Sequence, residues 1–301
     1  MSNRAKGQEK PYTTISTVGA SRDEWLKARR HGIGGSDAAA ILGLHPYKSA
    51  YSVWADKMGY GDNSDNEAMR QGRDFEEYVA KRFVEETGLK VRRSNMMYIS
   101  REYPMYANID RIVYSDGEFV GLECKTSSPF NEAKFRNEEY PDEYYTQCQH
   151  YMAVTGAKRW YLCVLVFQRK PMVYEIPRDE EDIRILIEAE TRFWNDHVIT
   201  GLAPAVDATD ATTDAIKRMH PTANGQTIEC VDENILSKLV TLKGEIQQLT
   251  FSKTFYENMI RDWFGDNEIM TGTEYMATYK NRTRADKQYR ELRVTRVKEA
   301  V

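Results

Sequence analysis

The sequence predicts an α/β protein in which helices flank a mixed central sheet, followed by a mainly helical C-terminal extension. A helical hydrophobic pattern over residues 67–87 precedes three runs with β-strand patterning, and a second helix then leads into two more strands. This order of helices, meander, crossover helix and strands is typical of a layered α/β domain. Beyond residue 204 the pattern changes to long helical spacing, with short strand-like runs only at the end.

The first part of the chain is expected to be flexible and then to form short helices. Residues 1–20 are polar, and the run Gly-Ile-Gly-Gly at 32–35 interrupts a helical pattern. Ser36 follows directly and is expected to cap the next helix, because a serine hydroxyl can accept a hydrogen bond from a free N–H group at a helix start. The short helices are expected at about residues 23–30, 38–42 and 49–58.

The longest early helix is expected at residues 67–87. Phe75, Val79 and Phe83 recur at i, i+4 and i+8 and would form its buried stripe, and Gly88 ends it. The elements that follow are expected as strands at 90–99, 105–114 and 118–126, a helix at 143–154, strands at 160–168 and 172–176, and a helix at 179–199.

The C-terminal part differs in composition. Residues 200–213 are rich in Gly, Pro, Ala, Asp and Thr and read as a linker. Residues 233–264 predict one long helix or a helical hairpin broken near Thr250, with an apolar stripe formed by Ile235, Leu239, Leu242, Ile246 and Leu249. Two β-like runs, 274–280 and 289–294, end the chain. The expected divisions are a flexible N-terminus at 1–20, a first domain at 21–204 and an extension at 205–301.

The bulk properties restrict location and partners. The 301 residues carry a formal net charge of −4, so overall charge would not attract DNA and any basic surface must be local. No apolar run approaches the roughly twenty residues that a membrane span needs, and the N-terminus lacks an apolar signal core, so we expect a cytoplasmic protein. The cysteines stand singly, which favours reduced thiols over zinc, iron–sulfur clusters or disulfides: Cys124, Cys148, Cys163 and Cys230.

The segment 108–127 carries the most information about function. Asp110 closes one β-patterned run, a Ser-Asp-Gly turn follows, and the next run presents Glu123 and Lys125. Side chains alternate along a strand, so Glu123 and Lys125 share one face beside Asp110. Carboxylates beside a lysine suit phosphodiester hydrolysis, because hard oxygen ligands hold Mg²⁺ and the lysine orients or deprotonates the attacking water. The alternative is an ordinary cross-strand ion pair on a solvated hairpin.

Glu76 and Gln147 are candidate supporting residues. Glu76 borders the apolar stripe of its helix and could complete a magnesium site, to which the backbone carbonyl of Cys124 could add an oxygen. Gln147 lies on the helix after the Glu-x-Lys strand and could reach the water or the phosphate. The alternatives are a solvated glutamate and a glutamine that satisfies backbone groups at the sheet end. His150 is interpreted as packing or a surface hydrogen bond.

Two basic regions could contact phosphate. Arg29 and Ser36 flank the glycine run, and an arginine fork, a hydroxyl and the free N–H groups of a helix start make a plausible phosphate pocket. Glycine runs are, however, often only turns. The C-terminal tail from Lys280 to Lys298 is rich in Lys and Arg, and it is either a solvated strand edge or a contact for DNA or a partner.

Several motifs occur in one order: Trp-x-x-x-Arg, Gly-Ile-Gly-Gly-Ser-Asp-Ala-Ala-Ala-Ile-Leu-Gly, Gly-Arg-x-x-Glu, Ile-Asp, Leu-Glu-Cys-Lys-Thr and Gln-Cys-Gln-His-Tyr-Met. From about Asp23 to Trp194 this series resembles the YqaJ-like viral recombinase nucleases, relatives of the bacteriophage lambda exonuclease in the PD-(D/E)xK superfamily. The resemblance implies a restriction-endonuclease-like core. It also implies digestion of duplex DNA ends from 5′ to 3′, leaving 3′ overhangs for recombination by single-strand annealing.

The resemblance also implies roles for single residues. Asp110, Glu123 and Lys125 match the catalytic trio, Glu76 matches a further acidic residue and Gln147 the family's glutamine. Arg29 and Ser36 match the residues that grip the terminal 5′ phosphate. The expected cofactor is Mg²⁺ or Mn²⁺, as one or two ions. The expected partners are DNA ends, a phage single-strand annealing protein and two further copies of the chain in a homotrimer. Alternatives are a RecB-like or Cas4-like nuclease and a non-catalytic module that binds DNA ends.

Overall fold

A computed structural model describes residues 9–62, 67–115 and 117–297, which form two compact units. The first unit ends at Ala223 and the second begins at Asn224. The expected boundary after residue 204 differs from this division, because helix α7 (Asp210–Met219) belongs to the first unit. Its Ala215 is fully buried, and Thr212 Oγ1 lies 2.8 Å from Ser49 Oγ at the start of helix α3 (Ala50–Ala55).

The first unit is built around a five-stranded mixed sheet in the order β3-β6-β7-β8-β9. Neighbours are antiparallel except for β7 and β8, which are parallel and therefore need a crossover helix between them. The strands are β3 (Val91–Arg93), β6 (Arg111–Tyr114), β7 (Phe119–Ser127), β8 (Arg159–Val166) and β9 (Met172–Pro177).

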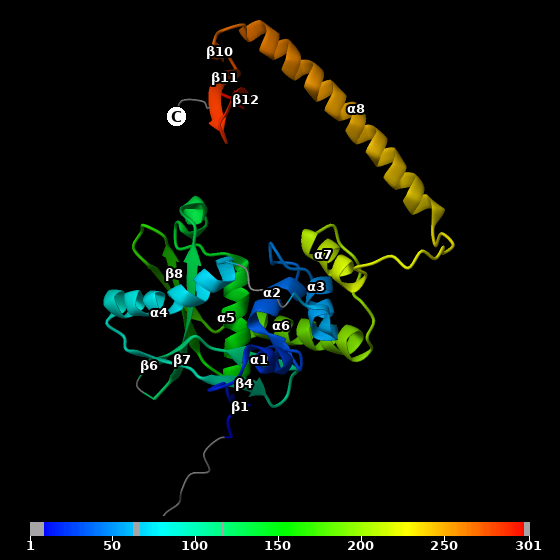
Figure 1. The fold of residues 1–301 in the computed structure, drawn as a ribbon. Helices are drawn as coiled ribbons and strands as arrows, with labels where there is room; N and C mark the ends of the chain where they lie inside the picture. The colour runs from blue at the N-terminus through cyan, green and yellow to red at the C-terminus, as the bar shows by residue number, and fades with distance from the viewer. Residues whose placement is uncertain (1–8, 63–66, 116, 298–301) are drawn as a thin grey trace, which may run out of the picture. The chain divides into compact units, whose positions relative to one another are not determined.

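Helices α4 (Glu67–Thr87) and α5 (Asp142–Thr155) cover opposite faces of this sheet (Figure 1). Val79 and Phe83 of α4 pack against Val120 and Leu122 of β7, as the helical stripe predicts. Met152 of α5 packs on the other face in a separate apolar cluster. Alternate side chains of β7 therefore point to opposite faces of the sheet, and Glu123 and Lys125 lie on the face that α5 covers.

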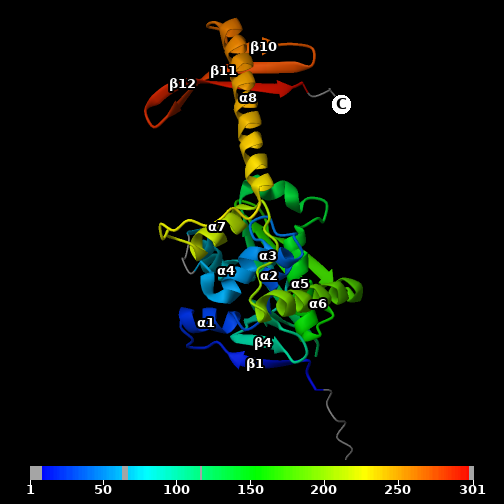
Figure 2. The same cartoon turned by 90° about the vertical axis from the view of Figure 1, so that its right-hand side faces the viewer.

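A second sheet has the order β1-β4-β5-β2, and it corrects two expectations. Part of residues 1–20 forms a strand: β1 pairs with β4 along its length (Figure 2). Tyr12 of β1 is buried against Tyr98 and Phe119. The predicted strands 90–99 and 105–114 each divide between the two sheets. The strands of this sheet are β1 (Tyr12–Ser16), β2 (Ile33–Gly34), β4 (Met96–Ser100) and β5 (Met105–Asn108).

Shorter helices complete the first unit. Ser36 does not cap α2: the cap residue is Gly34, whose N–H donates to Asp37 Oδ2 at 3.3 Å. The Asp37 carboxylate thus accepts the capping hydrogen bond that the Ser36 hydroxyl was expected to accept. The helices are α1 (Arg22–Arg29), α2 (Gly35–Ile41), α3 (Ala50–Ala55), α6 (Glu180–Phe193) and α7 (Asp210–Met219), with π-helical turns Asp56–Tyr60 and Trp194–Ile199 and a 3₁₀ segment Pro129–Phe135.

The second unit contains one long helix and a three-stranded meander. Helix α8 (Glu233–Phe264) runs through Thr250 without a break, so the hairpin alternative is wrong. Its predicted apolar stripe, from Ile235 to Leu249, is exposed. The strands are β10 (Ile269–Thr271), β11 (Tyr275–Arg284) and β12 (Lys287–Arg296). Among the residues described, no helix is both long and apolar enough to cross a membrane.

Candidate active site

Three predicted residues meet between β7 and α5. Lys125 Nζ lies 2.6 Å from Glu123 Oε1 and donates to Gln147 Oε1 at 3.0 Å. Gln147 Nε2 donates to Glu123 Oε1 at 2.7 Å and to the Tyr151 hydroxyl at 2.7 Å. Glu123 is only 3% exposed, so this is not the solvated hairpin pair considered as the alternative.

Asp110 joins this group from the junction between the two sheets. It directly precedes β6, whereas the sequence suggested that it closes a strand. Its Oδ2 accepts a hydrogen bond from the Cys124 N–H at 2.9 Å. Burial raises the pKa of Asp110 well above its usual value, and the neighbouring charges of Glu123 and Glu76 raise it further.

Burial also acts on the two charged groups of β7. It raises the pKa of Glu123, although Lys125 opposes the shift. For Lys125, burial disfavours the ammonium, but attraction to Glu123 and Asp110 outweighs it, so the pKa of Lys125 is raised. The site thus concentrates carboxylates in a buried place with one compensating cation.

Glu76 lies near this group but is held by another residue. The buried Arg111 makes an ion pair with Glu76 and donates to Glu77 Oε2 at 2.7 Å and to the Asp110 carbonyl at 2.7 Å. The sequence reading did not single out Arg111. Its position directly after Asp110, in a strand of otherwise apolar residues, is the signal that could have identified it.

The site has the chemistry of a hard-cation site. Within the described part of the chain, Glu123 Oε2 is buried without a hydrogen-bond partner, and a bound cation could coordinate this oxygen. Carboxylate oxygens are the ligands that Mg²⁺ prefers, and a cation would relieve the repulsion between Asp110 and Glu123. Over residues 9–62, 67–115 and 117–297, no group of three acidic, Cys or His side chains is arranged to hold a metal ion, and Glu76 is paired with Arg111.

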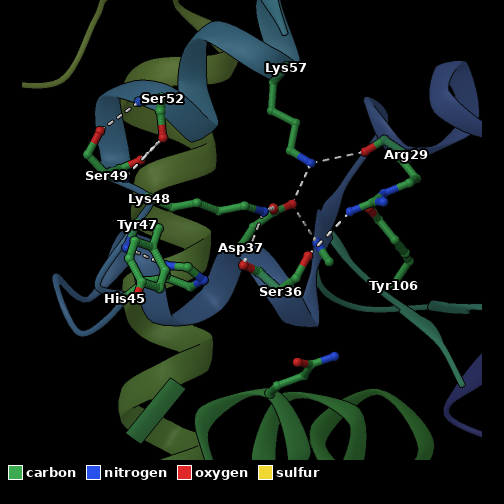
Figure 3. Close-up of polar contacts among 12 residues, drawn as sticks. Arg29, Ser36, Asp37, His45, Tyr47, Lys48, Ser49, Ser52, Lys57 and Tyr106 are labelled. Atoms are coloured by element: carbon green, nitrogen blue, oxygen red, sulfur yellow. Dashed lines mark hydrogen bonds and ion pairs between the residues drawn. The ribbon is translucent and has the colours of Figure 1, made fainter. Parts of the chain in front are cut away.

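The residues of the expected phosphate site lie together around Arg29 (Figure 3). The guanidinium stacks 4.4 Å from the Trp25 ring centroid, and its Nε donates to the Tyr106 hydroxyl at 3.0 Å. Its Nη2 donates to Ser36 Oγ at 3.3 Å. The structure therefore brings Arg29 and Ser36 together, as the glycine run suggested.

Asp37 and two lysines support this pocket, and the sequence reading missed all three. Lys57 Nζ lies 2.7 Å from Asp37 Oδ2 and donates to the Arg29 carbonyl at 3.1 Å (Figure 3). Lys48 Nζ lies 3.3 Å from Asp37 Oδ1 and 3.5 Å from the Ser36 carbonyl. The cations hold the pKa of Asp37 far below its usual range despite burial. Three cations thus surround Asp37, and Asp56 adds a second negative charge near Arg29 and Lys57, which leaves an excess of positive charge suited to an anion.

The expected phosphate site and the carboxylate group lie next to each other. A β-carbon at Gly35 would come within 2.6 Å of Tyr151 Cε1 and 3.0 Å of Gln147 Cγ, so only glycine allows this contact of α2 with α5. The charges that act on His45 agree with this proximity. Burial lowers its pKa to about 4, and Lys48 of the pocket and Lys125 of the carboxylate group both contribute.

His150 lies behind the site and is fully buried rather than at the surface. Its Nδ1 lies 2.8 Å from Glu190 Oε1 of α6, and its Nε2 lies 2.9 Å from the Tyr106 carbonyl. It contacts no candidate ligand and instead connects three elements, which agrees with the packing interpretation. The four cysteines are free thiols.

Comparison with known proteins supplies the family. Residues 24–158 match the YqaJ-like viral recombinase domain. The chain is 38% identical over 268 residues to the uncharacterized protein YqaJ of Bacillus subtilis strain 168, which covers 86% of this chain and 83% of that protein.

Two solved structures resemble the fold. An alkaline exonuclease from Laribacter hongkongensis, LHK-Exo, matches with a TM-score of 0.51 at 18% identity, covering 60% of this chain and 94% of that one. LHK-Exo in complex with dAMP matches with a TM-score of 0.50 at 18% identity, covering 66% and 98%. The predicted fold, a mixed central sheet flanked by helices, is confirmed, and the chain belongs to the YqaJ-like viral recombinase family.

Proposed function

We propose that this protein is a metal-dependent exonuclease that digests duplex DNA from 5′ to 3′ and leaves 3′ overhangs for phage-type recombination by strand annealing. One observation carries the proposal: the group of Asp110, Glu123, Lys125 and Gln147 adjoins the cationic cluster around Arg29. A phosphodiester-cleaving group beside an anion pocket suits removal of nucleotides from a phosphorylated end. The exonuclease named in the structural comparison supports the same reaction class.

The carboxylates would hold Mg²⁺, or Mn²⁺ in its place, as one or two ions. Asp110, Glu123 and the Cys124 carbonyl would be ligands, and Glu76 would join them on release from Arg111. Such an ion, when bound, neutralises charge on the scissile phosphate and lowers the pKa of a coordinated water. Lys125 is fixed by Glu123 and Gln147, and it would orient the attacking water and offset negative charge. Gln147 would hold the Glu123 carboxylate and the Lys125 ammonium in position through its two hydrogen bonds.

Arg29 and Ser36 would bind the terminal 5′ phosphate. A guanidinium has a planar fork of donors that matches phosphate oxygens, and here stacking on Trp25 fixes its plane. Lys48 would add a second charge from the other side of Asp37. Direction of digestion would follow, because the end held in this pocket places the adjacent phosphodiester at the carboxylates.

We also propose that the protein works as a homotrimer that encloses the duplex and hands the 3′ strand to a phage single-strand annealing protein. A chain of net charge −4 binds DNA more readily when local basic surfaces of several copies face the same axis.

The central experiment follows label release from linear duplex labelled at the 5′ or the 3′ end, with and without Mg²⁺. We expect early release of the 5′ label and only with metal. Glu123→Gln removes a ligand charge at constant shape and should lower the rate by about 100-fold or more. The matched control is Glu118→Gln on the same hairpin, where the side chain is exposed and pairs with Arg159 and Lys158.

Other results would point to other functions. Early release of the 3′ label would contradict the direction of digestion. Tight binding of DNA ends with no cleavage under any divalent metal would indicate a non-catalytic end-binding module. Cleavage that needs no free end would indicate a different nuclease of the same fold.

A further inference from the structure

The hairpin of β11 and β12 extends beyond the rest of its sheet. Strand β10 pairs with β11 only from Met276 to Thr278, whereas β11 and β12 continue to pair as far as Arg284 and Lys287. The part beyond Thr278 is therefore a two-stranded ribbon that ends in a tight turn.

One face of this ribbon is occupied by the end of α8. Tyr279 lies 5.7 Å from Phe264 between ring centroids, and Phe264 is buried. Arg290 packs 3.9 Å over the Tyr279 ring and donates to the carbonyls of Gly265 and Asn267. Arg290 is therefore a structural residue that caps the helix end.

The opposite face collects cations. Alternation and register place on it five basic side chains, one tyrosine and one carboxylate: Lys280, Arg282, Arg284, Lys287, Arg293, Tyr289 and Glu291. The carboxylate is shared, because Glu291 Oε2 lies 3.0 Å from both Arg282 Nε and Arg293 Nη2. Arg284 stands directly opposite Lys287 in the register, and such a like-charge pair destabilises a ribbon unless an anion lies over it.

We infer that this basic face of the β11–β12 ribbon binds duplex DNA, as a second contact separate in sequence from the candidate active site. Cations at alternate positions of one strand lie about 6.6 Å apart, so several can meet successive phosphates. A two-stranded ribbon fits the major groove of B-DNA, whose width is about 12 Å. The inference rests on the proposed function in one respect: the duplex is the substrate of the nuclease.

The contact explains how a slightly acidic chain can hold long DNA. It supplies attraction that depends on phosphate charge and not on a free end, whereas the Arg29 pocket needs a terminal phosphate. The ribbon would therefore raise affinity for internal duplex and keep the enzyme on its substrate between cuts.

The test measures binding to a duplex closed by hairpins at both ends, in EDTA, so that neither cleavage nor end recognition contributes. The full chain is compared with the variant Arg282→Gln, Arg284→Gln, Lys287→Gln. Each lost phosphate contact reduces the slope of log Kd against log salt by about 0.9, so three should reduce it by about 2.7. Between about 50 and about 200 mM salt, the unmodified protein should then lose about 40-fold more affinity than the variant.

A matched control removes the same charge elsewhere in the second unit: Lys238→Gln, Lys243→Gln, Lys253→Gln on exposed positions of α8. It should bind like the unmodified protein. The single variants Arg284→Gln and Lys287→Gln, both beside the turn, should each lower the slope by about 0.9. They keep the test valid if the triple variant folds poorly.

Two outcomes would overturn the inference: an unchanged slope in the ribbon variants, or an equal loss in the α8 control. Cleavage of short 5′-phosphorylated duplexes is measured in parallel, with Mg²⁺ in place of EDTA. Ribbon-dependent binding without any cleavage would refute the proposed function and leave the ribbon contact standing.

Discussion

At the scale of residues, the amide of Gln147 determines how the carboxylate group is arranged. Its nitrogen donates to Glu123 and Tyr151, and its oxygen accepts from Lys125, so both ends of the amide are used. A charged residue at this position could not both donate and accept, which explains why an uncharged side chain lies between a buried carboxylate and a partly exposed ammonium.

The first prediction at this scale concerns Arg29. Arg29→Gln should abolish any preference for 5′-phosphorylated over 5′-hydroxyl duplex ends, because the charged fork is lost. Initial rates on the two substrates give the measurement. Lys27→Gln is the matched control, since Lys27 is an exposed residue of the same helix. Equal rates on both ends in the unmodified protein would remove the basis for a phosphate pocket.

The proximity of Glu123, Lys125 and Gln147 could be predicted from the sequence because strand alternation and helix spacing fix which side chains share a face. That reasoning places Glu123 and Lys125 correctly toward α5. It could not predict that Arg111 holds Glu76, or that Lys48 and Lys57 flank Asp37, because these contacts join segments far apart in the chain. No local pattern encodes a partner that tertiary packing supplies.

At the scale of elements, α5 is the helix on which the site depends. It carries Gln147 toward β7, allows α2 to approach through Gly35, and is tied to α6 through His150 and Glu190. The last pair is fully buried and joins the helix to the carbonyl of Tyr106, whose hydroxyl contacts Arg29. The His150–Glu190 pair thus supports both α5, which carries Gln147, and Tyr106, which contacts Arg29.

This pair predicts a pH dependence of stability. Burial disfavours the imidazolium, but attraction to Glu190 outweighs it and raises the pKa of His150 above its usual 6.5. The folded protein therefore holds a proton that the unfolded chain releases. The stability it contributes is fully present below pH 6.5 and is lost as pH rises through the raised pKa.

The measurement is the free energy of unfolding from denaturant titrations across neutral pH. Glu190→Gln should destabilise the protein by about 3–5 kcal/mol at low pH, since it leaves a buried imidazolium unpaired, and should remove most of this pH dependence. An unfolding free energy that rises with pH over the same range in the unmodified protein would show that the pair does not hold its proton.

Element types were largely predictable from periodicity, whereas strand partners were not. The stripe of α4 and the alternation of β7 are local patterns, and both appear as expected. The division of residues 105–114 at Asp110 reflects a chain that passes from one sheet to another, and that change depends on non-local pairing. The strand Tyr12–Ser16 was missed because four of its five residues are exposed, so its pattern is polar.

At the scale of the whole molecule, we propose that phosphodiester cleavage takes place in the first unit and that the second unit contacts long DNA. All candidate catalytic residues lie before Ala223, and the basic ribbon and the exposed apolar stripe of α8 lie after it. A cut near residue 205 would remove α7, including Ala215 and Thr212. The surface of the α3 region against which these residues pack would then be exposed to solvent. The informative boundary is therefore the one after Ala223.

The last prediction is that a chain ending at Ala223 still cleaves short 5′-phosphorylated duplexes but digests long DNA in shorter runs. It keeps the carboxylate group, the Arg29 pocket and the core around α7, and it loses the ribbon cations whose phosphate contacts depend on salt. Product lengths in the presence of competitor DNA measure the run length, and light scattering gives the number of subunits with and without the second unit. A cooperative thermal transition serves as the control for folding. If the folded truncation cleaves no duplex even at low salt, the second unit contributes to the active site, and the division of labour between the units is wrong.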